Sequence, residues 1–143
     1  MTKALIPRAG AMRRSAAAIG LLAPLLVTPA HALSARETAE MKQLAPIDRM
    51  IQVCFLKLEA RIASETTFRR VDRVVLDAFS RGRIADRTVK ASGAAFRNKG
   101  EWFKLRFRCS VTPDRLHVET LRYELVSTTP VAHGEWEAHR LFP

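Results

Sequence analysis

Cysteine, histidine and tyrosine are scarce in this chain of 143 residues, which contains two, four and one of them. No C-x-x-C pair, no glycine-rich phosphate loop and no tight grouping of histidine with acids occurs in it. Zinc centres, covalent haem and phosphate loops depend on such patterns, so we expect no metal site and no cofactor. A G-x-S-x-G motif is also absent, which removes the usual sequence signal for a serine hydrolase.

The chain lacks an apolar run long enough to span a membrane. Residues 15–27 are its most apolar stretch, but a spanning helix needs about 20 such residues, and Pro24 interrupts this one. Residues 1–14 carry four cations and no acid, and Ala30-His31-Ala32 offers small residues to a signal peptidase. This pattern predicts a secretory signal peptide over residues 1–32, with an uncleaved anchor as the alternative.

Acidic residues are outnumbered, with 14 Asp and Glu against 24 Lys and Arg. Without the four cations of the signal peptide, 20 remain, and the net charge of residues 33–143 falls to about +6. Such a length suits a single mature domain, which we expect to be periplasmic or secreted, with no transmembrane span after cleavage. A basic surface favours an anionic envelope polymer or a partner protein, or it serves solubility alone; export argues against nucleic acid.

Both cysteines, Cys54 and Cys109, lie in the predicted mature chain. An even cysteine count in an oxidising compartment predicts one disulfide between them. Two free thiols or an intermolecular bridge are the alternatives.

Helical spacing dominates the first part of the mature chain. Residues 34–44 predict a short helix, with Ser34 and Glu37 forming a capping box. Pro46 breaks this helix, and a second, amphipathic helix follows. Its expected apolar face comprises Ile47, Ile51, Cys54, Phe55, Leu58 and Ile62.

Strand patterns follow over residues 71–79, 88–96 and 102–111, with Gly93 at a bulge or a point of close contact in the second. In the third strand, Cys109 belongs to the apolar, packed side, which would meet the helix that carries Cys54. A hairpin continues to residue 126, and a switch in apolar parity predicts a bulge near Glu119 or Thr120. The sequence therefore predicts an α+β fold in which an N-terminal amphipathic helix packs on a small, mostly antiparallel sheet. The predicted fold also contains one disulfide and a short C-terminal helix or turn over residues 133–141.

The best candidate site is the polar side of the third strand, where Trp102, Lys104 and Arg106 alternate with apolar residues. The expected register places Leu121 opposite Phe107 and therefore Arg106 opposite Arg122. Directly opposed like charges destabilise a sheet, so this pair is a candidate anion-binding site, with Trp102 at its edge. The alternative is a solvated face on which long cationic side chains spread apart.

Catalytic residues are not indicated. Asp77, Glu101 and Glu135 are the carboxylates that would matter if two of them converged in a cleft, as glycoside hydrolysis requires. Nothing in their spacing predicts convergence, and a disulfide would leave no cysteine nucleophile.

Residues 45–143 resemble a bacterial domain-of-unknown-function family, number 930. The most specific part of the likeness is Gly93-Ala94-Ala95-Phe96-Arg97 followed by Gly100-Glu101-Trp102. Further matching positions are Cys54, Ala78-Phe79-Ser80, Phe107-x-Cys109, Pro113-Asp114 and Trp136. The resemblance implies an exported protein with paired cysteines and brings no established activity. Phe55 departs from the family pattern, which has an acid after the first cysteine.

These observations favour an exported, non-enzymatic envelope protein that uses a basic sheet face for binding or for a structural role. The alternative is a small periplasmic hydrolase acting on cell-wall or polysaccharide material. A subunit with little activity of its own is a third possibility, which an exposed apolar patch would indicate.

Overall fold

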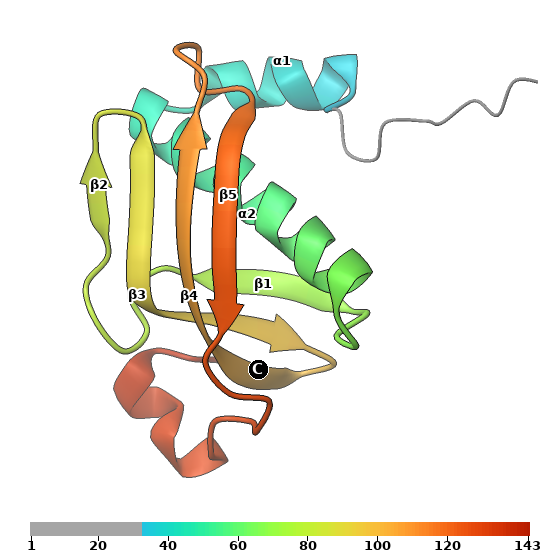
Figure 1. Cartoon of the computed structure of the whole chain (residues 1–143), viewed down its shortest axis with the longest axis vertical. Helices are drawn as coiled ribbons and strands as arrows, with labels where there is room; N and C mark the ends of the chain where they lie inside the picture. The colour runs from blue at the N-terminus through green and yellow to red at the C-terminus, as the bar shows by residue number, and fades with distance from the viewer. Residues whose placement is uncertain (1–32) are drawn as a thin grey trace, which may run out of the picture.

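The structure is a computed structural model and describes residues 33–143, so the predicted signal peptide lies outside the described residues. Two helices precede a five-stranded sheet, and two short 3-10 turns follow it (Figure 1). The elements are α1 Ala35–Gln43, α2 Pro46–Glu65, β1 Val71–Val75, β2 Arg83–Ala85, β3 Thr88–Asn98, β4 Glu101–Val111, β5 Val118–Leu125, η1 His133–Glu135 and η2 Glu137–His139.

The sheet is antiparallel throughout its paired strands, in the order β1-β3-β4-β5, and β2 pairs with the other half of β3. A bulge at Ser92 and Gly93, opposite Arg106, interrupts the β3–β4 ladder and confirms the bulge predicted at Gly93. Bulges bend the strand that carries them. Figure 1 shows β3 changing direction along its length, so that β2 lies beside one half and β1 beside the other.

The main core lies between α2 and one face of the sheet, which we call the inner face (Figure 1). Sheet residues that alternate along β4 and helix residues at helical spacing meet there. The predicted helix face is partly wrong, because Ile47 is 54% exposed. The buried α2 residues are Met50, Val53, Cys54, Leu58 and Ile62.

The disulfide joins Cys54 of α2 to Cys109 of β4, with 6.1 Å between the two Cα atoms. Both residues are fully buried in the main core. The α+β fold, the mostly antiparallel sheet, the disulfide and the short C-terminal turns are therefore as the sequence predicted.

Helix α1 is held at both ends, and its N-terminus has the predicted capping box. The Glu37 amide donates to the Ser34 hydroxyl at 3.2 Å, and the Glu37 carboxylate accepts from the Ser34 amide at 2.8 Å. Arg49 then binds the last turn of α1, donating to the carbonyls of Met41 and Leu44. A helix this short is marginal alone, so these contacts stabilise it.

The β4–β5 register differs from the prediction by two residues. Leu121 faces Cys109 rather than Phe107, and Val111 faces Val118. The connecting loop is longer than a two-residue turn, because Thr112 hydrogen-bonds to His117 through both backbone and side chain. The predicted bulge is present, with Glu119 as the extra residue. A shift by two leaves every side chain on its expected face and changes only its partner.

The first predicted strand is too long. β1 ends at Val75, and Asp77 lies in the following turn, where its carboxylate accepts from the Gly82 amide at 2.6 Å. The short strand β2, which the sequence did not predict, then pairs with β3.

A second, smaller core lies on the outer face of the sheet, opposite α2. The C-terminal segment packs there and covers Trp102, which is fully buried. The Val131 amide donates to the Trp102 carbonyl at 2.8 Å, and the Trp102 indole donates to the Phe142 carbonyl at 3.1 Å. Figure 1 shows this segment at one end of the sheet, which leaves the other end of the outer face uncovered.

Candidate functional site

Four cations lie in direct register across the uncovered part of the outer face. Arg83 of β2 faces Lys90 of β3, Lys90 faces Arg108 of β4, and Arg108 faces Arg122 of β5. Directly paired residues point to the same face of a sheet. We call this set, Arg83, Lys90, Arg108 and Arg122, the cation row.

The cation row has no acidic partner among the described residues. All four side chains are exposed, and none forms an ion pair within residues 33–143. Adjacent strands lie about 4.8 Å apart, so the row extends over about 14 Å. Like charges at this spacing repel one another, and the row opposes folding unless an anion neutralises it.

A shallow hollow of about 440 Å³ opens over the β3–β4–β5 part of the row. Lys90, Arg108 and Arg122 line it together with Ser92 and the Arg106–Glu124 pair. The hollow therefore offers a concentration of guanidinium and ammonium groups to a ligand on an open surface. Guanidinium groups suit carboxylate, sulfate and phosphate because their N–H donors match the oxygen pairs of these anions.

Of the four residues predicted from the sequence, the structure brings only Arg106 and Arg122 to the same hollow. Trp102 lies under the C-terminal segment, so the expectation that it borders a solvent-exposed site is wrong. Lys104 is half-buried, with its ammonium 4.7 Å from the centre of the Phe79 ring. Arg106 faces Glu124 and approaches it to 3.7 Å, so the predicted Arg106–Arg122 pairing is also wrong. Only Arg122 belongs to the cation row.

Sequence reasoning missed three members of the row. Arg108 alternates with apolar residues of β4 as Arg106 does, but the predicted register did not place it opposite Arg122. Lys90 alternates with the buried Val89 and Ala91, which was a usable signal. Arg83 stands in a three-residue strand with no buried position, and no sequence pattern marks such a strand.

The carboxylates considered for catalysis do not converge. Asp77 binds the Gly82 amide, and Glu101 pairs with His133, whose Nε2 lies 3.0 Å from a Glu101 oxygen. Glu135 is exposed in η1. None of these three carboxylates lines the hollow over the cation row.

A different carboxylate is electrostatically unusual. Burial, together with the neighbouring charge of Asp72, raises the pKa of Glu59 in α2 to about 7. Asp72 itself pairs with Arg97 at 2.9 Å, and hydrogen bonding to that guanidinium lowers the pKa of Asp72. A pair of carboxylates with separated pKa values is a feature of acid–base catalysis. Neither residue lines the hollow over the cation row.

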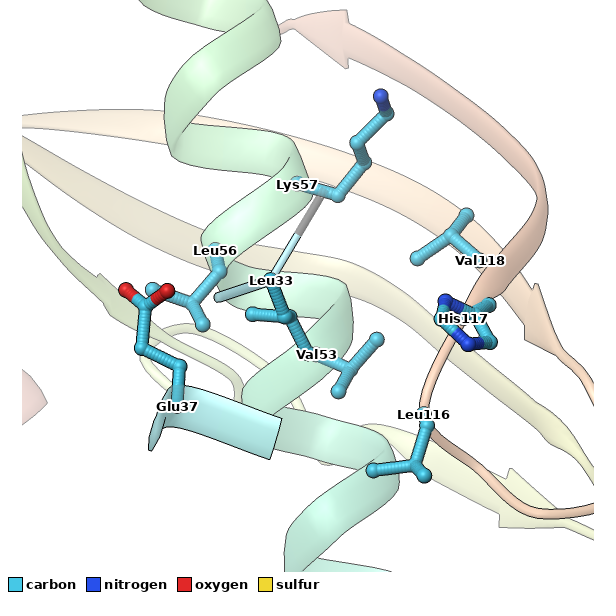
Figure 2. A pocket seen from close by; sticks show the side chains of 8 residues that line it. All are labelled: Leu33, Glu37, Val53, Leu56, Lys57, Leu116, His117 and Val118. Atoms are coloured by element: carbon cyan, nitrogen blue, oxygen red, sulfur yellow. The ribbon is translucent and has the colours of Figure 1, made fainter. Parts of the chain in front are cut away.

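A second hollow, of about 370 Å³, lies between α1, α2 and the β4–β5 connection. Figure 2 shows apolar side chains such as Val53 and Leu116 along it, with Glu37, Lys57 and His117 on different sides. Glu37 is already engaged by the cap of α1. These polar groups do not converge on a common point, so the arrangement indicates no catalytic or metal chemistry. Within residues 33–143, no three His, Cys, Asp or Glu side chains gather as a metal ion would require.

The described helices include none with the length and apolar character needed to cross a bilayer.

Comparison with curated proteins and with solved structures finds no match. A family model, described as Domain of Unknown Function (DUF930), matches residues 41–141. This range includes both cysteines and all four members of the cation row. The chain therefore belongs to the DUF930 family.

Proposed function

We propose that the protein is an exported, single-domain binding protein of the cell envelope that holds an anionic ligand on the outer face of its sheet. The signal pattern of residues 1–32 supports export to the periplasm or beyond, and the disulfide is compatible with an oxidising compartment. The cation row is the single observation that carries the binding role.

Repulsion within the row is the reason to assign it a role. Each pair of directly opposed like charges reduces the stability of the sheet by about 0.2–1 kcal/mol. Acids are available nearby, since Glu124 and Glu119 pair with Arg106 and Arg87, yet none pairs with the row. An anion bound along the row would remove the repulsion and gain several charge-assisted hydrogen bonds.

The hydrolase alternative receives less support. Hydrolysis of a glycosidic bond needs two carboxyl groups flanking a bound substrate. Glu59 lies in α2, whereas Asp72 binds Arg97 beside Trp102 of the outer core, and neither carboxylate lines the hollow that the cation row borders. A role as a subunit of a larger assembly also receives little support, because the large exposed apolar residues do not adjoin one another in the sequence. They are spread over four segments: Leu44 and Ile47, Ile84, Val126, and Phe142.

The experiment compares two variants of equal charge. In the row variant, Arg83, Lys90, Arg108 and Arg122 are all replaced by glutamine. The control variant carries glutamine at four other positions, which are exposed and lie outside the row: Lys42, Arg70, Lys99 and Arg140. Protein purified after expression of the full chain is titrated with poly-L-glutamate at low salt.

The row variant should lose about tenfold or more in affinity, because each lost contact contributes a few tenths of a kcal/mol or more. The control variant should lose much less, although its net charge is the same. Equal losses in the two variants would show that binding follows net charge alone and would overturn the proposal. The row variant should unfold at the same temperature as wild type or higher, because repulsion is removed.

A further inference from the structure

A second row of aligned side chains runs beside the cation row. Thr88 of β3 faces Ser110 of β4, and Ser110 faces Thr120 of β5. Each lies two residues along its strand from a member of the cation row, and therefore on the same face. We call Thr88, Ser110 and Thr120 the hydroxyl row. The hydroxyl oxygens of Ser110 and Thr120 are hydrogen-bonded to each other at 2.5 Å.

Hydroxyl groups also border the cation row on its other side. Ser92 is exposed in the β3 bulge, lines the hollow beside Lys90, and lies 3.1 Å from the Ser80 hydroxyl, oxygen to oxygen. The cations of β3, β4 and β5 thus have the hydroxyl row on one side. On the other side they have Ser92 in β3 and the Arg106–Glu124 pair across β4 and β5. A basic surface that only kept the protein soluble would not need hydroxyl groups aligned beside its cations.

We infer that the ligand is a linear polymer of acidic sugars, lying across the strands along the cation row. This inference rests on the proposed function and specifies its ligand class. The carboxylates of successive sugars would meet successive cations, because one strand spacing is similar to the length of one sugar ring. Ring hydroxyls beside each carboxylate would then meet the flanking serine and threonine hydroxyls. A polymer that crosses four strands uses all four cations, whereas a single small anion uses two.

Other anionic surfaces fit the same face less well. A lipid surface is usually bound with apolar side chains inserted beside the cations. The exposed Ile84 faces the buried Val89 in the ladder and so belongs to the inner face. Single-stranded nucleic acid is bound by stacking on aromatic rings. The aromatic residues nearest the row are Phe107 and Tyr123, and both side chains pack into the main core of the inner face, where the Tyr123 hydroxyl donates to Glu65.

The test separates sugar recognition from charge recognition. Thr88→Val, Ser110→Ala and Thr120→Val are combined, which removes the hydroxyl row while keeping its shape and all charges. A control variant, Ser64→Ala with Thr67→Val and Thr128→Val, removes three hydroxyls elsewhere on the described surface. Full-chain protein is titrated with an oligogalacturonate longer than the row and with poly-L-glutamate, which presents carboxylates without ring hydroxyls.

The hydroxyl-row variant should bind oligogalacturonate at least about fivefold more weakly and poly-L-glutamate as wild type does. The ratio of the two affinities is the readout, since a general loss of folded protein lowers both alike. Single Ser110→Ala should move the ratio in the same direction.

Three outcomes have different meanings. In the first, the hydroxyl-row variant has the same affinity ratio as wild type, while the row variant, which lacks the four cations, binds neither polymer. Charge alone is then recognised, so this inference fails and the proposed function stands. If the row variant binds both polymers as wild type does, both fail. Tighter binding to phosphatidylglycerol vesicles than to oligogalacturonate would assign the face to lipid and overturn the inference.

Discussion

At the scale of single residues, neighbours decide what each cation does. Arg97 binds Asp72 through two nitrogens at 2.9 and 3.0 Å and also approaches the Trp102 ring, so it is a structural residue. Arg108 has only cations beside it in the ladder. Composition cannot separate the two, because the difference lies in which strand positions face each other.

Glu59 provides a prediction at this scale. Its pKa is about 7 in the folded protein against 4.5 without burial, so the folded state holds the proton more tightly. Stability should fall as pH rises from about 4.5 through 7, because the unfolded chain ionises first. The penalty should reach about 2–3 kcal/mol, allowing for partial exposure. Glu59→Gln should therefore be more stable than wild type at pH 8 by this amount and nearly equal to it at pH 4, measured by urea unfolding.

The exposed Glu135 gives the matched control. Glu135→Gln should leave the pH profile of unfolding as in wild type. A Glu59→Gln difference that is constant from pH 4 to pH 8 would contradict the prediction.

At the scale of elements, the bulge in β3 packs against the β1–β2 connection. The Phe79 amide donates to the Gly93 carbonyl at 2.7 Å, which brings the β1–β2 connection against the bulge. A Cβ atom at position 93 would lie 2.4 Å from the Ser80 backbone nitrogen. Glycine is therefore required by close approach of backbone to backbone, and the bend that exposes the cation row depends on it.

Gly93→Ala should reduce the free energy of unfolding by about 1–3 kcal/mol, because the backbone of Ser80 must move. Thermal or urea unfolding measures the loss. Gly134→Ala is the control, since nothing lies within 4 Å of an added Cβ there. Equal stability of Gly93→Ala and Gly134→Ala would show that the connection is loosely held.

At the scale of the whole molecule, the fold depends on two closures. The disulfide fastens α2 to the inner face at β4, and the C-terminal segment closes the outer core over Trp102. The first closure ties the sheet to α2, and the second limits the open outer face to the end that carries the cation row. Ligand binding to a surface that is already ordered loses little conformational entropy.

Breaking the disulfide should lower the free energy of unfolding by about 4 kcal/mol, from the loop-closure entropy of 55 residues of separation. The measurement compares urea unfolding of wild type with and without reductant. Cys54→Ala combined with Cys109→Ala should be insensitive to reductant and at least as unstable as reduced wild type. An unchanged midpoint for wild type in reductant would contradict the prediction.

Local pattern was enough for most of the fold. The capping box at Ser34, the alternation along β4, the helix that carries Cys54 and both bulges follow from short-range chemistry and periodicity. The candidate site was only partly predictable. Arg122 was identified, but its partner was not, because a loop held by Thr112 and His117 moved the register by two residues.

The sequence by itself determined which side chains of β4 belong to the packed inner face, the pairing of Cys54 with Cys109 and the excess of positive charge, because these depend on periodicity, cysteine number and composition. Only the tertiary structure decided that Trp102 is buried, that β2 joins the sheet and that four cations align. These features depend on contacts between segments far apart in the chain. The register of the strands follows from loop geometry, and the covering of the sheet by the C-terminal segment follows from packing. No local pattern encodes either of them.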